Sequence, residues 1–480
     1  MARINTNIAA LTAQRNLTGA YRSLNTTMEH LSTGLRISRG KDDPAGLIVS
    51  ERLRTEISAV GQAVSNTQRA KLIVATAEGA LDEVASLLKD VQAKIVEAAN
   101  KGAFSDEEIK ANQLQIDSAI DSITRIANTT TFAGRKLLDG SLAYNTSGVE
   151  LDAVRDLHVH AAQFGERAAI EVSVDVQTAA ETGKLRFPFA GLAAPSAGGD
   201  VTIEIRGNGG ATVLQFAGST TAAKIVEAVQ TVADATGVSA SLHPTSGLVL
   251  VSRGYGSKQF VQVRALSGTF DTRDYDDVNV RKSKDFGTDA IATINGAVAA
   301  ADGNHLSIKN SLIDLELDAH PNSAYSTTFM ITGGGALFQV GPQVNTNLQV
   351  NMAINSVGAA ELGLAEVGYL AQIRTGGDFA LTNQDPRFNE ASKIVGRAID
   401  QISMLRGRLG SFERNTLDTN MNQLTITSEN LMSAESAIRD ADFAYETSRL
   451  ARDQILVNAG TTILTLANQT TQSVLRLLGG

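Results

Sequence analysis

Residues 417–438 read LDTNMNQLTITSENLMSAESAI, and apolar side chains in this stretch recur every seven positions. The repeat is formed by Leu417, Leu424, Leu431 and Ile438, with Met421 and Ala434 between them. Because a seven-residue apolar repeat puts one stripe on one face of a helix, it predicts a helix that packs lengthwise against a partner. We therefore expect a chain organised around long paired helices.

The two ends of the chain carry shorter apolar stripes. Residues 454–473 contain no charged side chain, but they are too rich in Asn, Gln and Thr for a membrane span, which needs about 20 mostly apolar residues. Near the N-terminus, a stripe with steps of three and four is formed by Tyr21, Leu24, Met28, Leu31 and Leu35. Narrow stripes with uncharged flanks favour burial among neighbouring chains, so we expect both ends to become ordered on assembly.

The most regular helical pattern lies between residues 60 and 98. Its small and apolar positions alternate steps of three and four without a slip: Val60, Ala63, Thr67, Ala70, Val74, Ala77, Leu81, Val84, Leu88, Val91, Ile95 and Ala98. Ser105, followed by three acidic residues, predicts the capped start of a helix that runs back along the first. A C-terminal stripe completes the predicted bundle with Ala391, Val395, Ala398, Ile402, Leu405, Leu409 and Phe412.

Residues 34–46 connect the first two helical stretches. Asp43 can cap the helix that follows, and Pro44 suits its first turn. The mixed charges of this connector fit either a plain link between helices or contacts between subunits. Both interpretations stay open on the residues alone.

Between about 143 and 375 the apolar pattern changes to a period of two. Residues 201–205 alternate, Gly207-Asn208-Gly209-Gly210 reads as a turn, and residues 212–216 complete a hairpin. A capped helix is expected over 219–235, with further strands at 238–242, 248–252 and 260–265. The segment is therefore an α+β unit, followed by a second β-rich segment over 289–317.

Composition excludes several classes of protein. The chain has 480 residues, a formal net charge of -9 and no Cys, which disfavours a general nucleic-acid binder and excludes disulfides and thiolate metal sites. Neither a phosphate loop nor an HExxH motif occurs in the sequence. We interpret His158 and His160 as part of an exposed strand and not as metal ligands. We expect no catalytic residues, no metal and no cofactor, and a hydrolysis assay on the central region would test this.

Motifs at both ends resemble those of bacterial flagellins. The N-terminal motifs are Ile4-Asn5-Thr6-Asn7, residues 31–37 (LSTGLRI) and residues 41–46 (KDDPAG), where Pro44 replaces a common Ala. The C-terminal motifs are residues 437–444 (AIRDADFA), Gln454-Ile455-Leu456, Ala459-Gly460, Ala467-Asn468-Gln469 and residues 474–478 (VLRLL). In the middle, residues 337–341 (LFQVG) resemble the segment that leads back into the flagellin core. Residues 292–296 and 312–317 resemble a short repeat found in many flagellins and hook-associated proteins.

The resemblance implies a mainly α fold with a β-rich insertion. The N- and C-terminal regions would form a long antiparallel coiled-coil bundle, and the insertion would form one or more α+β outer domains. We divide the chain into an N-terminal filament-core helix with its connector (1–45), half of the bundle (46–142), the outer insertion (143–375), a C-terminal bundle helix (376–438) and a C-terminal filament-core helix (439–480). The insertion is either one unit or two subdomains, at about 143–285 and 286–345.

The implied function is structural: a subunit that polymerises into the helical filament used for swimming. A protein of the hook–filament junction is the alternative, but residues 467–469 and 338–341 favour flagellin. The implied partners are many copies of the chain itself, hook-associated proteins, the filament cap, the flagellar export apparatus and an export chaperone. Neither nucleic-acid binding nor membrane insertion is implied. Export is expected to use the flagellar type III route, without a cleaved signal peptide.

The resemblance also assigns roles to individual positions. The residues expected to pack between subunits are Ile4, Ile8, Leu11, Tyr21, Leu24, Met28, Leu31, Leu35, Arg36, Asp42, Asp43, Leu456, Ile463, Leu466, Val474, Leu475 and Leu478. Many flagellins are recognised by a Toll-like receptor through their second and third helices. The aligned positions here are Asp90, Lys94 and Gln115, in place of an Arg, an apolar residue and a Glu. Because charge reversal opposes binding, we expect weak receptor activation.

Overall fold

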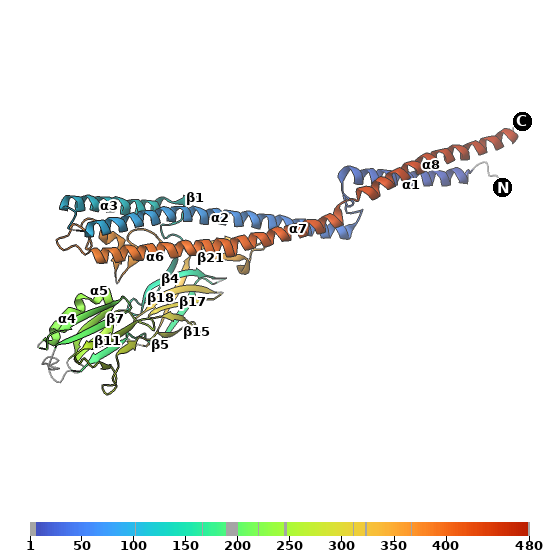
Figure 1. Cartoon of the computed structure of the whole chain (residues 1–480). Helices are drawn as coiled ribbons and strands as arrows, with labels where there is room; N and C mark the ends of the chain where they lie inside the picture. Colours follow the sequence, from blue (N-terminus) through green and yellow to red (C-terminus); the bar gives the residue numbers. More distant parts are fainter. Residues whose placement is uncertain are drawn as a thin grey trace. The chain divides into compact units, whose positions relative to one another are not determined.

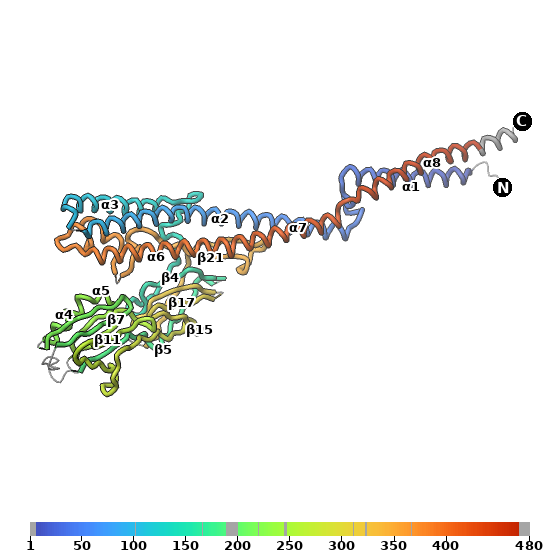
Figure 2. Tube along the Cα trace, in the orientation of Figure 1, coloured from blue at the N-terminus to red at the C-terminus, as the bar shows by residue number. Residues whose placement is uncertain are grey.

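The computed structural model describes residues 6–100, 102–165, 167–188, 200–218, 220–243, 247–310, 312–321, 324–365 and 367–478 (Figures 1 and 2). The chain forms two compact units. One comprises residues 1–71, 339–348 and 413–480, and the other comprises residues 72–338 and 349–412. Each unit therefore combines N-terminal and C-terminal parts of the chain.

Long helices form the two terminal regions of the chain. They are α1 (Ile8–Thr33), α2 (Pro44–Ala99), α3 (Asp106–Thr129), α6 (Phe388–Phe412), α7 (Thr419–Arg439) and α8 (Phe443–Leu478). In the second unit, α3, the C-terminal part of α2 and α6 run side by side (Figure 1). Every position of the predicted stripe between Val60 and Ala98 is buried, which confirms it as a core seam. No helix in the described part of the chain combines the length and apolarity needed to cross a membrane.

The starts of α2 and α3 follow from their capping residues. Ser105 Oγ accepts a hydrogen bond from the Glu108 N–H at 3.4 Å, and the Glu108 carboxylate accepts one from the Ser105 N–H at 2.8 Å. This reciprocal pair is the predicted capping box. At the start of α2, Asp43 Oδ1 accepts a hydrogen bond from the Gly46 N–H at 2.9 Å, as expected for an N-cap residue.

A π-helical segment, Glu413–Asp418, joins α6 to α7. The steps of three and four that end at Phe412 would continue at Thr416, but the next apolar residue is Leu417, one position later. A π turn accommodates one extra residue, so it absorbs this slip. Leu417 is buried, and Leu424 packs with Val60 and Ala63 of α2.

The outer part of the insertion contains two pairs of antiparallel sheets. In the first pair, a five-stranded sheet has the order β15-β14-β5-β19-β3 and a four-stranded sheet has the order β16-β17-β18-β4. Their strands are β3 (Tyr144–Ser147), β4 (Val154–Ala162), β5 (Ile170–Thr178), β14 (Ile291–Ile294), β15 (Ala297–Val298), β16 (Ala300–Asp302), β17 (His305–Lys309), β18 (Ile313–Ala319) and β19 (Tyr325–Gly334). One apolar core unites both sheets, including Val172, Leu315 and Phe329.

The second pair of sheets has the orders β12-β6-β10-β9 and β13-β11-β7-β8. Its elements are β6 (Lys184–Phe187), β7 (Val201–Gly207), β8 (Ala211–Phe216), α4 (Ala222–Thr231), α5 (Ala233–Thr236), β9 (Val238–His243), β10 (Gly247–Ser252), β11 (Phe260–Ser267), β12 (Arg273–Asp274) and β13 (Lys284–Phe286). The predicted hairpin is confirmed, because β7 pairs with β8. The single helix predicted over 219–235 is instead two helices divided at Val232, and its N-cap residue Thr221 makes no side-chain capping bond. Ser219, the first residue of the predicted helix, lies outside the described residues.

After the outer sheets, the chain returns to the helices through short elements. These are β20 (Ala336–Gln339), η1 (Thr346–Leu348), β21 (Gln349–Met352), β22 (Gly363–Leu364), β23 (Gly368–Tyr369) and η2 (Leu370–Ile373), while β1 (Thr131–Phe132) and β2 (Arg135–Lys136) follow α3 on the way out. Gln113 of α3 donates to the Ile373 carbonyl at 2.9 Å and accepts from the Leu381 N–H at 2.7 Å. This part of the return segment therefore packs into the bundle.

Candidate assembly surface

Helices α1 and α8 pair in antiparallel orientation within the first unit (Figure 1). The C-terminal end of α1 contacts the N-terminal end of α8. The N-terminal end of α1 contacts residues further along α8. At the start of α1, Asn7 accepts from the Ala10 N–H at 3.0 Å as N-cap, and its amide donates to the Ala467 carbonyl at 2.9 Å. At its end, Gly34 takes a left-handed conformation with φ of 73°, which suits a residue without a Cβ.

The contact between the two helices contains buried polar groups beside the buried apolar residues Ala13 and Val457. His30 Nδ1 lies 2.9 Å from the Glu446 carboxylate, and the Asp453 carboxylate accepts hydrogen bonds from Ser23 at 2.7 Å and Thr27 at 3.3 Å. All of these side chains except that of Ser23 are buried. We call Ser23, Thr27, His30, Glu446 and Asp453 the polar seam. Because each partner is specific, the seam sets the register of the pair.

Large apolar side chains lie on the outside of the pair. Exposed ones are Ile8, Leu11, Tyr21, Met28, Tyr445, Ile455, Leu456, Ile463 and Leu466. Tyr21 and Met28 of the predicted N-terminal stripe are 45% and 54% exposed, while Leu24, Leu31 and Leu35 are half-buried. The chain itself therefore covers only part of that stripe, and hydroxyls and His30 on α1 contact the carboxylates of α8.

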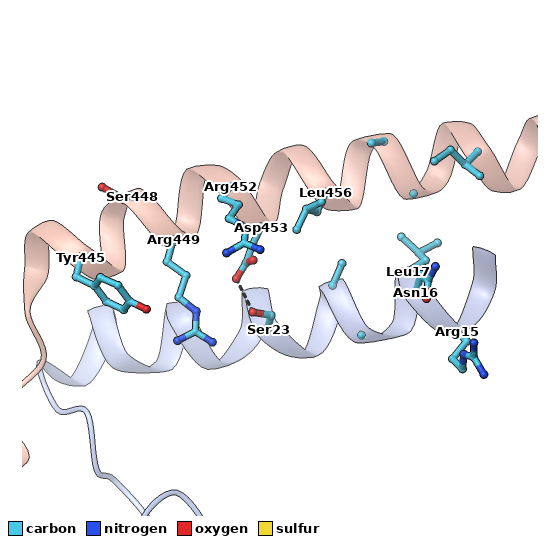
Figure 3. Close-up of a pocket in the computed structure, with 15 residues that line it drawn as sticks. Arg15, Asn16, Leu17, Ser23, Tyr445, Ser448, Arg449, Arg452, Asp453 and Leu456 are labelled. Atoms are coloured by element: carbon cyan, nitrogen blue, oxygen red, sulfur yellow. Dashed lines mark hydrogen bonds between the residues drawn. The ribbon is translucent and has the colours of Figure 1, made fainter. Parts of the chain in front are cut away.

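A groove of about 960 Å³ lies between α1 and α8 (Figure 3). Its walls include Leu17, Leu456 and Tyr445, with Arg15 and Arg449 among the charged groups. In the described part of the chain, neither arginine forms an ion pair. The groove thus offers apolar surface next to unneutralised positive charge.

The connector between α1 and α2 is bonded to the chain segment between α7 and α8. Arg36 donates its backbone N–H to the Arg439 carbonyl at 2.7 Å and its guanidinium to the Ile438 carbonyl at 2.6 Å. The Ala441 N–H in turn donates to the Gly34 carbonyl at 2.9 Å. Asp42 accepts from the Arg39 N–H at 2.9 Å, and this bond is the main cause that lowers the pKa of its carboxyl. Arg36, Asp42 and the capping Asp43 thus all make contacts within the chain.

The structure describes only some of the remaining predicted positions. Ile4 lies outside the described residues, and the side chains of Val474, Leu475 and Leu478 in α8 do as well. Asp90 and Gln115 are exposed, whereas Lys94 is half-buried and pairs with Glu97 at 2.7 Å. Within the described residues, no group of three or more His, Cys, Asp or Glu side chains is arranged to hold a metal ion.

Sequence reasoning missed the polar seam. Its signal is visible in hindsight as polar residues at heptad spacing, Ser23 and His30 on α1 and Glu446 and Asp453 on α8. The heptad spacing puts each polar pair on one face of its helix, but it does not identify which residues of the two helices meet. The apolar stripe of α1 includes exposed as well as half-buried residues, so apolar periodicity alone did not reveal these polar contacts.

Comparison with known proteins connects both ends of the chain to one family. The family model for the bacterial flagellin N-terminal helical region matches residues 4–143, and the model for the bacterial flagellin C-terminal helical region matches residues 392–478. A model of the flagellin hook IN motif matches residues 202–254, which cover β7 to β10. The short repeat is thus matched there and not in the segment over 289–317.

Similarity to individual proteins extends along the whole chain. The chain is 29% identical to the B-type flagellin of Pseudomonas aeruginosa, with 99% of each chain covered. It is 28% identical to the polar flagellin F of Vibrio parahaemolyticus and 28% identical to the flagellin of Salmonella muenchen, again with 99% of each chain covered. Among solved structures, FliC of Burkholderia pseudomallei aligns with a TM-score of 0.23 and 15% identity, over 72% of this chain and 99% of that one.

Proposed function

The chain belongs to the bacterial flagellin family, whose members polymerise into the flagellar filament, and we propose that α1 and α8 form the surface through which its copies assemble. The similarity along the full chain is to flagellins, so a hook–filament junction protein is not favoured. One observation supports the assignment of the surface. The terminal helix pair buries a cluster of polar groups and leaves several large apolar side chains exposed.

This arrangement favours association. Burial of apolar surface contributes roughly 25 cal/mol per Å², so side chains such as Leu11 and Ile463 are stabilised when a second copy covers them. Their exposure leaves apolar side chains on both helices that one chain does not cover. The assembly residues are therefore proposed to be the predicted set on α1 and α8, while Arg36, Asp42 and Asp43 hold the connector in place within each subunit.

Charge substitution tests the proposed surface. Ile463→Asp puts a carboxylate among apolar neighbours in the filament, where an uncompensated buried charge costs about 3–5 kcal/mol. We expect no sedimentable filaments from seeded monomer, with a circular dichroism spectrum like that of the unchanged chain. Val298→Asp on strand β15 is the matched control, because Val298 is also apolar and is 79% exposed. Normal growth of the Ile463→Asp protein would refute the assignment.

We further propose, from the family resemblance, that the subunit leaves the cell through the flagellar type III route with the help of an export chaperone. Hook-associated proteins and the filament cap are the proposed neighbours at the filament ends. No enzymatic role is proposed. Secretion by a strain that lacks the flagellar export apparatus would contradict the proposed route.

Weak detection by the Toll-like receptor is a separate proposal. Asp90 is exposed on α2 and carries a charge opposite to that of the Arg in the family pattern, and Gln115 on α3 lacks the carboxylate. A receptor reporter assay on purified monomer should show low potency. Asp90→Arg with Lys94→Leu should raise it, and potency equal to that of an enterobacterial flagellin in the unchanged protein would overturn the proposal.

A further inference from the structure

Helix α6 carries two polar contacts with the outer sheets. At its C-terminal end, the Arg408 guanidinium contacts the imidazole of His160 on β4 and the carboxylate of Glu316 on β18. Near its N-terminus, Lys393 and Asn389 donate to the Asp234 carboxylate of α5 at 3.2 Å and 3.0 Å. Lys393 and Arg408 are fifteen residues apart on one helix, roughly 22 Å at the rise of an α-helix.

We propose that these two contacts hold the insertion against α6, and that mild acid weakens the Arg408 contact by removing its bond to His160, while the Lys393 contact is unchanged. How the insertion is held against α6 is a property separate from filament assembly. The response to acid rests on the chemistry of His160, whose side chain is only 14% exposed.

The contact at Arg408 requires a neutral imidazole. A guanidinium has donors and no acceptor, so Arg408 can bond a ring nitrogen of His160 only where that nitrogen keeps its lone pair. Protonation removes the lone pair and puts a second positive charge beside the guanidinium. Between the two cations, the hydrogen bond is replaced by repulsion.

The pH range follows from the surroundings of His160. Burial is the main cause that lowers the pKa of His160 below its ordinary value of 6.5, and the charge of Arg408 also lowers it, while the hydrogen bond to Glu316 acts in the opposite direction without reversing the shift. The form with this contact made therefore binds the proton less readily than the form without it. Stability from this contact is present above the ordinary pKa and is lost as pH falls below it.

Several other charged groups lie near His160. They are Asp156 and His158 on β4, His305 on β17, Asp314, Glu316 and Asp318 on β18, and Arg408 on α6. Hydrogen bonding by His160 lowers the pKa of Glu316 to about 2, so this carboxylate stays ionised in mild acid. The side-chain bond to Asp318 raises the pKa of His305, so that pair is strongest below 6.5 and weakens as pH rises through the folded pKa. That pair joins two strands of one sheet and does not involve α6.

The second contact is insensitive in this pH range. Hydrogen bonds from Arg253 and Lys393 lower the pKa of Asp234 below its ordinary value of 3.8. Its contribution is lost only as pH falls below that value. Acid should therefore loosen the insertion at its Arg408 contact first, where the ion pair with Glu316 remains.

Distance measurements on the full-length monomer test whether acid loosens the insertion. Because the chain has no Cys, spin labels can be placed at Met404→Cys on α6 and Val298→Cys on β15, both exposed positions. Pulsed EPR distances are then compared at about pH 7.5 and about pH 5, on either side of the ordinary histidine pKa. We expect one narrow distance population at the higher pH and its partial loss to a broader population at the lower pH.

Two matched substitutions identify the group responsible. His160→Gln keeps an acceptor for Arg408 but cannot gain charge, so the narrow population should persist at both pH values. His158→Gln, on the same strand but paired with Asp156, should respond to pH like the unchanged protein. Arg408→Met should show the broad population at both pH values, with unchanged thermal melting of the bundle. An identical distribution at both pH values in the unchanged chain, or equal effects of the two histidine substitutions, would overturn the proposal.

Discussion

At the scale of single residues, Asp453 illustrates how one buried acid can set the pairing of two helices. Its carboxylate is the acceptor for both Ser23 and Thr27. Asp453→Ala leaves these hydroxyls without that acceptor, which costs about 1–3 kcal/mol. We expect the critical monomer concentration for filament growth to rise by roughly five- to 150-fold, since 1.4 kcal/mol is a factor of ten. Asp453→Asn retains an acceptor oxygen and should have a clearly smaller effect; equal effects would show that the bonds are unimportant.

At Gly46 a larger residue would lack space and would also disturb the capping of α2. A Cβ at this position would lie 2.5 Å from Asp43 Oδ2 and 2.7 Å from Ile37 Cδ1. Gly46→Ala should therefore displace the cap of α2 and cost about 1 kcal/mol of stability. Gly61→Ala, in the same helix with no neighbour within 4 Å, should instead stabilise by about 1 kcal/mol. Thermal unfolding compares the two, and the same sign for both would contradict this account.

At the scale of elements, the π-helical segment is the clearest departure from a regular helix. If it exists to absorb one extra residue, removal of exposed Arg414 should join α6 and α7 as one α-helix and keep Leu417 and Leu424 on the buried face. An Ala inserted after Arg414 should instead rotate these leucines by about 100° and expose them, at about 1.5–3 kcal/mol each. Melting temperatures measured by circular dichroism should separate the two variants. Equal destabilisation would show that the segment has another cause.

The helices and the main outer strands could be predicted because local periodicity encodes them. The stripe from Val60 to Ala98 and the β7–β8 hairpin needed only spacing and turn residues. Polar contacts between distant segments could not be predicted in this way. Arg408 meets His160 across 248 positions of sequence, and His30 meets Glu446 across 416. No periodic pattern links such partners, since the fold must first bring them together.

At the scale of the whole molecule, the path of the chain indicates where the insertion can be removed. The outgoing strand β3 pairs with the returning strand β19, with Ser147 opposite Met330 and Tyr144 opposite Gly334. The return segment beyond them belongs with the helices. Ile354, Leu370 and Ile373 are fully buried, and the Ile373 carbonyl accepts from Gln113. We therefore propose that the outer region ends before this segment, earlier than the boundary at residue 375 expected from the sequence.

Two deletions test this boundary against each other. In the first, residues 148–329 are replaced by Asn-Gly, which favours the tight turn that a two-residue hairpin requires. The same protein carries Ile331→Thr, because the deletion would leave the apolar side chain of Ile331 uncovered. In the second, Gly140 is joined to Gly376 by a short Gly-Ser linker, which removes three fully buried apolar side chains at about 2–5 kcal/mol each. Loop closure itself differs little between the two, because its cost grows only slowly with length. We expect the first protein to melt cooperatively and to form filaments visible by electron microscopy, and the second to do neither. If both deletions polymerise, the return segment is not part of the bundle core; if neither does, the outer sheets are needed for assembly.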